Sequence, residues 1–81
     1  MTPEEQKLFD FLSSQYLKIR LLEDGTFIGL SDLLYTRAIF MDMTHWGYGR
    51  RFCFEDRELA SREFEKLKTG EQEPVGFIAR R

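Results

Sequence analysis

A chain of 81 residues is long enough for one small domain, and we expect residues 1–81 to form it. Lys and Arg number 12 against 14 Asp and Glu, so the net charge of −2 is neither the basic balance of a bulk nucleic-acid binder nor a strongly acidic one. A single cysteine excludes an internal disulfide, and no apolar stretch approaches the ~20 residues of a membrane helix. No signal peptide is recognised, so the expected location is the cytoplasm.

The first predicted element is a helix over residues 2–15. Thr2 suits the N-cap position, and Pro3 suits the first helical position because its missing N–H is not needed there. Apolar residues follow at helical spacing and form one stripe, which predicts packing against a sheet. The stripe consists of Leu8, Phe9, Leu12 and Tyr16, with Phe11 just off it.

A β-hairpin is predicted over residues 16–30. Apolar residues alternate with Lys and Arg on its first arm, and Asp24-Gly25 is a strong hairpin signal because both central positions of the turn require positive φ. Pairing the arms around this turn places the apolar residues of both arms on one face. The predicted pairs are Leu21 with Ile28 and Ile19 with Leu30.

Residues 31–35, with the sequence Ser-Asp-Leu-Leu-Tyr, allow two interpretations. Ser31 could cap a short helical turn, or the strand could bend here and run on as the first arm of the next hairpin. We favour the bend.

Residues 36–56 are predicted to form a central hairpin with an aromatic, glycine-rich tip. Side chains alternate across a strand, so the apolar residues of each arm share one face. Pointing both sets to the core leaves residues 46–49 as the loop, whereas a slip of one residue would bury Asp42. The inward set is Ile39, Met41, Met43, Phe52 and Phe54, with Met43 opposite Phe52 and Met41 opposite Phe54.

This register separates the single histidine from the single cysteine. His45 and Cys53 fall on opposite faces of the hairpin, about 10 Å apart along it, at ~3.3 Å per residue. A thiolate–imidazolium pair is therefore not expected.

A second helix is predicted over residues 56–69. Asp56 suits its N-cap, and Gly70 suits the left-handed position that often follows a helix. Charged residues cover the solvent side of this helix. The buried stripe is predicted to be Leu59, Ala60, Phe64 and Leu67.

The chain then passes through polar residues 71–73, and residues 75–79 are predicted to form a last short strand. The resulting order is α-β-β-β-β-α-β. Two hairpins imply an antiparallel sheet, which two amphipathic helices can cover. The predicted fold class is α+β, a two-layer domain with two helices on one face of the sheet. The place of the last strand, centre or edge, stays open.

No constellation of catalytic or metal-binding residues is recognised. One His and one Cys do not make a tetrahedral metal site, and the nucleophile Cys53 would lack a base within reach. Gly47-x-Gly49 lacks the further glycine and the helix of a dinucleotide site. A single strand carboxylate such as Asp42 is usually exposed to solvent or ion-paired. We expect no metal, no cofactor and no enzymatic activity.

The hairpin tip is the candidate partner-binding site. It combines Trp46 and Tyr48 with the adjacent pair Arg50 and Arg51, residue types that are enriched where partners bind. Two conformations are open at this point. Trp46 either folds back over the sheet edge with Tyr48 capping it, or projects as a recognition tip.

Much of the chain, about residues 21–77, resembles a group of small bacterial and bacteriophage or prophage open reading frames. They share an aspartate–glycine hairpin, an aromatic-Cys-aromatic strand and a Pro-x-Gly-aromatic ending, with tryptophan more common at the positions of Phe52 and Phe77. The group has no established activity, so the resemblance implies no catalytic residues. The matching runs are Leu21-Leu22-Glu23-Asp24-Gly25, Leu33-Leu34-Tyr35-Thr36-Arg37-Ala38-Ile39, Gly47-Tyr48, Arg51-Phe52-Cys53-Phe54 and Glu73-Pro74-Val75-Gly76-Phe77.

The function expected from the sequence is a small cytoplasmic protein-interaction module without enzymatic activity, and a phage or prophage origin is compatible with it. The alternative is a single-stranded nucleic-acid binder that stacks bases on a basic, aromatic strip. A homodimer through an open sheet edge is compatible with both functions. The strip would use Arg37, Arg50, Arg51, Arg80 and Arg81 with Trp46 and Tyr48.

Overall fold

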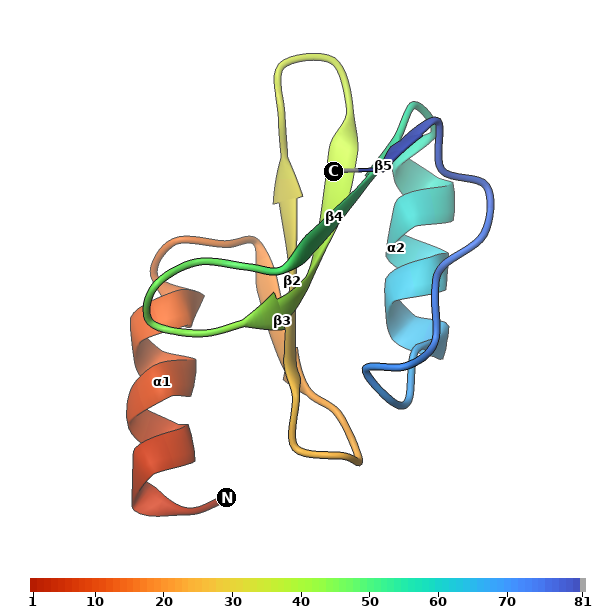
Figure 1. The fold of residues 1–81 in the computed structure, drawn as a ribbon. Helices are drawn as coiled ribbons and strands as arrows, with labels where there is room; N and C mark the ends of the chain where they lie inside the picture. Colours follow the sequence, from red (N-terminus) through yellow and green to blue (C-terminus); the bar gives the residue numbers. More distant parts are fainter. Residues whose placement is uncertain (81) are drawn as a thin grey trace.

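The computed structural model describes residues 1–80, which form two helices and a five-stranded antiparallel sheet (Figure 1). The predicted α+β class and the order α-β-β-β-β-α-β are confirmed. The elements are α1 (Pro3–Ser13), β1 (Lys18–Leu21), β2 (Phe27–Asp32), β3 (Arg37–Met43), β4 (Arg50–Phe54), α2 (Arg57–Lys66) and β5 (Ala79–Arg80).

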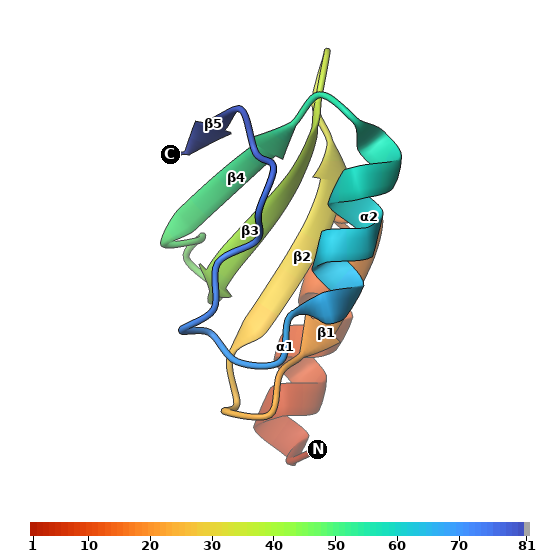
Figure 2. The same cartoon turned by 90° about the vertical axis from the view of Figure 1, so that its right-hand side faces the viewer.

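The strands follow one another across the sheet in chain order, β1-β2-β3-β4-β5, so each strand pairs with its neighbour in the sequence (Figure 2). β5 lies at the edge beside β4 and forms two residue pairs with it. The prediction of a strand over residues 75–79 is wrong except at Ala79, since β5 is Ala79–Arg80. Before it the chain is held by side-chain packing, including Phe77 on Phe52. Between β2 and β3 the chain reverses at residues 33–36, where the Leu33 N–H binds the Thr36 carbonyl, so neither the short helical turn nor the favoured bend that runs on in one direction is formed.

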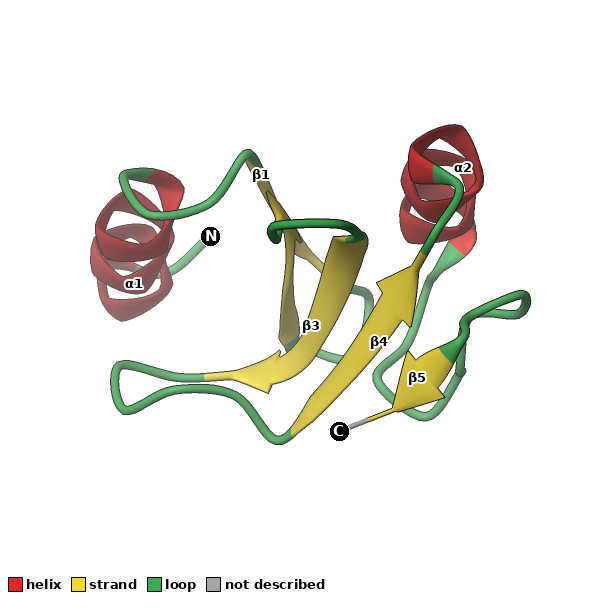
Figure 3. Ribbon diagram, turned by 90° about the horizontal axis from the view of Figure 1, so that it is seen from above, coloured by secondary structure: helices red, strands yellow, loops and turns green. Residues whose placement is uncertain are grey.

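The two helices cover opposite faces of the sheet, so the prediction of two layers with both helices on one face is wrong (Figure 3). β3 shows why: Ala38, Ile39, Phe40 and Met41 are all buried, at consecutive positions. Since neighbouring residues of a strand point to opposite faces, such a run needs cover on both sides. The sheet is therefore the middle layer of three.

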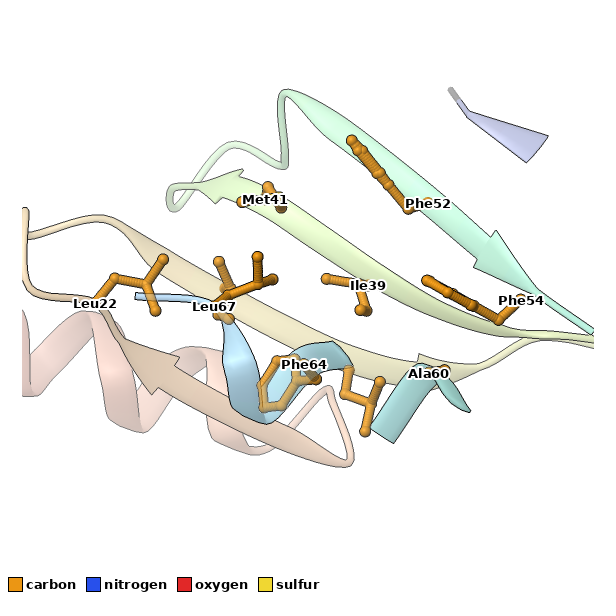
Figure 4. Close-up of a cluster of buried hydrophobic side chains, with 10 residues drawn as sticks. Leu22, Ile39, Met41, Phe52, Phe54, Ala60, Phe64 and Leu67 are labelled. Carbon is orange, nitrogen blue, oxygen red and sulfur yellow. The ribbon is translucent and has the colours of Figure 1, made fainter. Parts of the chain in front are cut away.

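The face under α2 holds the larger core, in which side chains of β2, β3 and β4, together with Leu22 just after β1, meet the helix (Figure 4). Phe52, Phe54 and Phe64 are fully buried there. The Arg20 guanidinium covers the outer side of this core, with its carbon 5.6 Å from the centre of the Phe64 ring. The core consists of Leu22, Ile28, Leu30, Ile39, Met41, Phe52, Phe54, Ala60, Phe64 and Leu67.

The face under α1 holds a second core. Gly29 leaves room in it, since a Cβ there would lie 2.7 Å from the Met43 sulfur and 3.0 Å from Ile19 Cδ1. The predicted α1 stripe is confirmed, because Leu8, Phe9, Leu12 and Tyr16 all pack here. The buried members of this core are Leu12, Ile19, Phe27, Ala38, Phe40, Met43 and Cys53.

Both helix starts agree with their predicted caps. The Thr2 hydroxyl accepts a hydrogen bond from the Glu5 N–H, and the Glu5 carboxylate accepts one from the Thr2 N–H, which completes a capping box. Asp56 caps α2 through the N–H groups of Glu58 and Leu59. The predicted end of α2 is wrong, because the helix stops at Lys66 and Gly70 lies beyond it without positive φ.

The first hairpin has a register one residue away from the predicted one. Its turn contains three residues, because the Leu22 N–H binds the Thr26 carbonyl across residues 23–25. Gly25 supplies the left-handed conformation, with φ of +86°. The observed pairs include Ile19 with Gly29, Arg20 with Ile28 and Leu21 with Phe27.

The predicted register of the central hairpin is wrong by four residues. Phe52 pairs with Ile39 instead of Met43, and Phe54 pairs with Arg37 instead of Met41. The difference lies in the position of the turn, which falls two residues earlier than predicted, and the pairing of β3 with β4 keeps one register from Arg37 opposite Phe54 to the bridge between Thr44 and Gly47. Asp42 has φ of +59°, in the left-handed region, and the pairing of β2 with β3 shifts register beside it. This β-bulge interrupts the alternation, so Met43 packs on the α1 side and Met41 on the α2 side.

The C-terminal strap, residues 74–78, is fixed on the α2 side of the molecule. The Phe77 ring stacks on Phe52 with centroids 5.0 Å apart, and Pro74 is fully buried. Glu63 of α2, whose exposed fraction is 5%, accepts a hydrogen bond from the Val75 N–H at 3.0 Å and another from Lys66 at 3.1 Å. These donors, the Val75 N–H above all, hold the pKa of Glu63 below its ordinary value although burial opposes them.

Truncation of Phe64 to Ala is expected to lower the free energy of unfolding by about 3–5 kcal/mol, because a fully buried ring leaves a cavity between α2 and the sheet. The matched control is Phe11→Ala, which removes the same ring from a site that is 43% exposed and should cost less than about 1 kcal/mol. Urea denaturation of both variants measures the two values. Equal losses would contradict the described core.

Replacement of Glu63 by Gln tests the proton dependence of the strap. The folded pKa is lowered, so the carboxylate stabilises the fold above the ordinary pKa of 4.5, and this stabilisation is lost as the pH falls through the folded value. At pH 7 the variant should be less stable by about 1 kcal/mol, or some 4–8 °C in Tm. The Tm difference from wild type should shrink on acidification below pH 4.5. A constant difference down to pH 3 would refute the assignment.

Candidate partner-binding loop

The β3–β4 loop, residues 44–49, reverses the chain more tightly than predicted. Thr44 and Gly47 are joined by two backbone hydrogen bonds, at 2.8 and 3.4 Å, so His45 and Trp46 form a two-residue turn instead of the predicted loop over residues 46–49. The Thr44 hydroxyl also accepts a hydrogen bond from the Trp46 N–H at 3.1 Å. Gly47 has φ of +141°, a backbone conformation that L side chains rarely adopt.

Trp46 projects from this turn with 96% of its surface exposed. The alternative in which it folds back over the sheet edge is therefore not the one observed. Exposure of a large indole on a loop that is closed by backbone hydrogen bonds gives the molecule an apolar protrusion. A concave partner surface could bury it.

Tyr48 fixes the other half of the loop to the α1 side of the sheet. Its ring meets Phe40 edge to face, with centroids 4.9 Å apart, and Phe40 in turn meets Tyr16 at 5.3 Å. Tyr48 is 42% exposed, so half of the ring serves packing and half faces solvent. It thus lies beside Trp46 in the candidate surface but also anchors the loop.

The loop reaches across to α1, as the ribbon shows (Figures 1 and 3). The ring of His45 lies against the ring of Phe11, with centroids 5.3 Å apart. Phe11 is half-exposed, and its position just off the apolar stripe of α1 was the sequence signal for a role outside the core. The sequence analysis missed Phe11 and His45 as members of this surface.

Arg50 lies at the base of the loop, and groups of the protein itself bind its guanidinium. Its guanidinium binds both carboxylate oxygens of Asp42, at 2.7 and 3.1 Å, and donates to the carbonyl of Gly70. Glu73 lies 3.9 Å away on the other side. The hydrogen bonds to Asp42 raise the pKa of Arg50 further above its ordinary value. Arg50 therefore contributes to the shape of the loop more than to its free surface.

Arg51 is separated from Arg50 by the alternation of β4. It pairs with Phe40 across the sheet, on the α1 side, and is half-buried. Its Nε is buried and has no hydrogen-bond partner within residues 1–80. The four predicted site residues therefore divide: Trp46 and Tyr48 share the loop surface, Arg51 lies next to it, and Arg50 lies beneath it.

The residues considered for chemistry stay apart. Cys53 is buried opposite Ala38, whereas the exposed His45 lies seven residues after Ala38, beyond the bulge. Their predicted separation by opposite faces is not the reason, since His45 leans toward α1 and Cys53 belongs to the α1-side core. Across residues 1–80 no cluster of His, Cys, Asp and Glu could hold a metal, and no ligand-sized cavity is formed.

A second exposed apolar turn lies at the opposite end of β3, and the sequence analysis did not propose it as a surface. Leu34 and Tyr35 are 80% and 82% exposed at the reversal between β2 and β3. Arg37 lies beside this turn, at the start of β3, and Asp32 accepts its hydrogen bond at 2.7 Å. Since Trp46 lies beyond the other end of the strand, Arg37 does not form one strip with it. Arg81 of the predicted strip lies outside the described residues.

No protein family, curated relative or solved structure matches this chain. The fold and the surface therefore stand on their own geometry: an α+β protein with an antiparallel sheet between two helices and an indole exposed at the tip of its β3–β4 hairpin. Within residues 1–80, neither helix combines the length and the apolar character that crossing a bilayer requires.

Exchange of Asp42 for Ala or for Gly separates the backbone role of this residue from its ion pair. Both variants lose the carboxylate that binds Arg50, but only Ala resists φ of +59°. Asp42→Ala should therefore be less stable than Asp42→Gly by about 1 kcal/mol, offset in part by the larger unfolded-state entropy of Gly. Thermal unfolding of the pair measures the difference, and a more stable Ala variant would show that Asp42 does not hold the bulge.

Proposed function

We propose that this protein is a cytoplasmic protein-interaction module without enzymatic activity, which binds a partner protein by placing Trp46 in an apolar pocket of that partner. A bacteriophage or prophage origin is part of the proposal and rests on the sequence resemblance. The observation that carries the binding role is the 96% exposed indole at the tip of a hydrogen-bonded turn.

The energetics favour this surface for binding. Burial of an indole in a well-fitting pocket is among the largest single contributions in protein interfaces, and truncation of such a residue often costs 2 kcal/mol or more. The loop is also held by contacts of its own, through Tyr48 on Phe40 and His45 on Phe11. A loop that is ordered before binding loses less conformational entropy on association.

The nucleic-acid alternative has less support from the arrangement of charges. Arg37 and Arg50 are both engaged by carboxylates, Asp32 and Asp42 respectively. Base stacking on Trp46 would then lack a continuous basic groove for the phosphates. We keep protein recognition as the favoured function.

Replacement of Trp46 by Ala is the test of the proposed surface. A partner is first captured on the wild-type protein from a bacterial lysate, identified and purified. Calorimetric titration then compares its affinity for the wild type and for Trp46→Ala. We expect a loss of at least 2 kcal/mol, about 30-fold in Kd, because the indole would leave its pocket.

The matched control is Tyr35→Ala, which removes a comparably exposed aromatic ring at the opposite end of β3. Its affinity for the purified partner should stay within twofold of wild type. An unchanged affinity of Trp46→Ala would refute the proposed surface, and a loss confined to Tyr35→Ala would move the surface to the β2–β3 turn.

A further inference from the structure

Arg50 connects the β3–β4 loop with a part of the chain twenty residues away along the sequence. On one side its guanidinium holds the left-handed Asp42 through two hydrogen bonds. On the other it binds the carbonyl of Gly70, within the post-α2 loop, residues 68–73. The guanidinium is thus a bridge between the start of the β3–β4 loop and the post-α2 loop.

The post-α2 loop is itself fixed at its far side. The Gly70 N–H donates to the Asp24 carboxylate at 2.6 Å, and the Thr26 hydroxyl donates to the same carboxylate at 2.7 Å. Gly70 has no room for a side chain, because a Cβ would lie 2.8 Å from the Thr26 Oγ1. The post-α2 loop also accepts the Glu23 N–H through the Lys68 carbonyl at 2.9 Å. The β1–β2 turn therefore sets the position of the Gly70 carbonyl that Arg50 binds.

The loop side of the bridge is equally close-fitting. A Cβ on Gly49 would lie 2.9 Å from the Asp42 Cβ, so the returning strand passes directly over the bulge. The Gly49 N–H donates to the Met41 carbonyl at 3.0 Å. Any shift of the Asp42 carboxylate is therefore transmitted to the backbone on both sides of the loop.

We infer that Arg50 is a positioning residue, through which the post-α2 loop controls the order of the β3–β4 loop that carries Trp46. The inference rests on the proposed function, because only that function makes the order of the β3–β4 loop important for binding. The effect of Arg50 on the order of the loop does not require a partner. Asp24 and Gly70 belong to the same chain of contacts, although neither lies in the β3–β4 loop. A ligand or protein that displaced the post-α2 loop would loosen the surface around Trp46 and weaken binding there.

The test measures backbone order by nitrogen-15 relaxation in the whole protein. In the wild type, amides of residues 44–49 should have order parameters near 0.85, typical of rigid backbone. In Arg50→Gln and in the remote Gly70→Ala, the order parameters of residues 44–49 should fall below about 0.6. The amides of β2 and those of residues 38–40 in β3 should stay rigid. The matched control is Glu71→Ala, an exposed side chain of the same post-α2 loop with no contact to the bridge, which should leave the order of residues 44–49 unchanged.

Each outcome decides the inference. A rigid loop in Arg50→Gln, a disordered loop already in the wild type, or an effect of Arg50→Gln without one of Gly70→Ala would overturn it. If Arg50→Gln does not fold, Arg50→Lys takes its place, since it keeps the charge but loses the two-pronged contact with Asp42. A failure of Trp46→Ala to weaken partner binding would remove the proposed function and leave these order parameters unaffected, so the two failures are distinguishable.

Discussion

The architecture depends on β3 being buried on both of its faces. Ala38 and Phe40 face α1, while Ile39 and Met41 face α2. A strand of this kind cannot lie on a surface, because one of its apolar faces would meet water. The two helices must therefore separate to the two sides, and the thin core that a short chain can build is divided into two smaller ones. Eight phenylalanines supply much of the area that makes this division stable.

The same strand also leads into the candidate surface, and its regular pairing with β2 is interrupted at Asp42, just before the β3–β4 loop. Asp42 adopts a left-handed conformation where the pairing with β2 shifts register, and Met43 beyond it packs on the opposite face from Met41. Arg50 neutralises the carboxylate that this conformation leaves at the base of the loop. The exposure of the indole follows from the position of the turn: the hairpin closes through the hydrogen bonds between Thr44 and Gly47, so Trp46 is one of the two residues left outside the ladder.

Local signals in the sequence were sufficient for the elements and their order. The caps Thr2 and Asp56 and both helical stripes are short-range patterns, and the structure contains them as predicted. Register was not predictable in the same way. Asp24-Gly25 is compatible with turns of two or three residues, and this single choice moves every pair of the first hairpin by one.

The arrangement of the sheet between two helices could have been predicted from the sequence of β3. Four consecutive apolar residues in β3 are the pattern of a strand buried on both faces, which the rule of alternating faces by itself does not reveal. The location of the candidate surface at Trp46 and Tyr48 was predictable from residue type. The role of Arg50 was not, because its partner Asp42 becomes reachable only through a backbone conformation that no sequence pattern announced.

The order of the strands has a kinetic consequence. Each strand from β1 to β4 pairs with the next one along the chain, so the sheet can grow by closing three short loops in turn. Loop closure of this kind costs little chain entropy and favours rapid folding. The pairing of β5 with β4 closes a much longer loop that includes α2, and Phe77 reaches its place on Phe52 across that same distance. The final residues therefore add to a sheet that is already assembled, and they are the natural first part of it to detach.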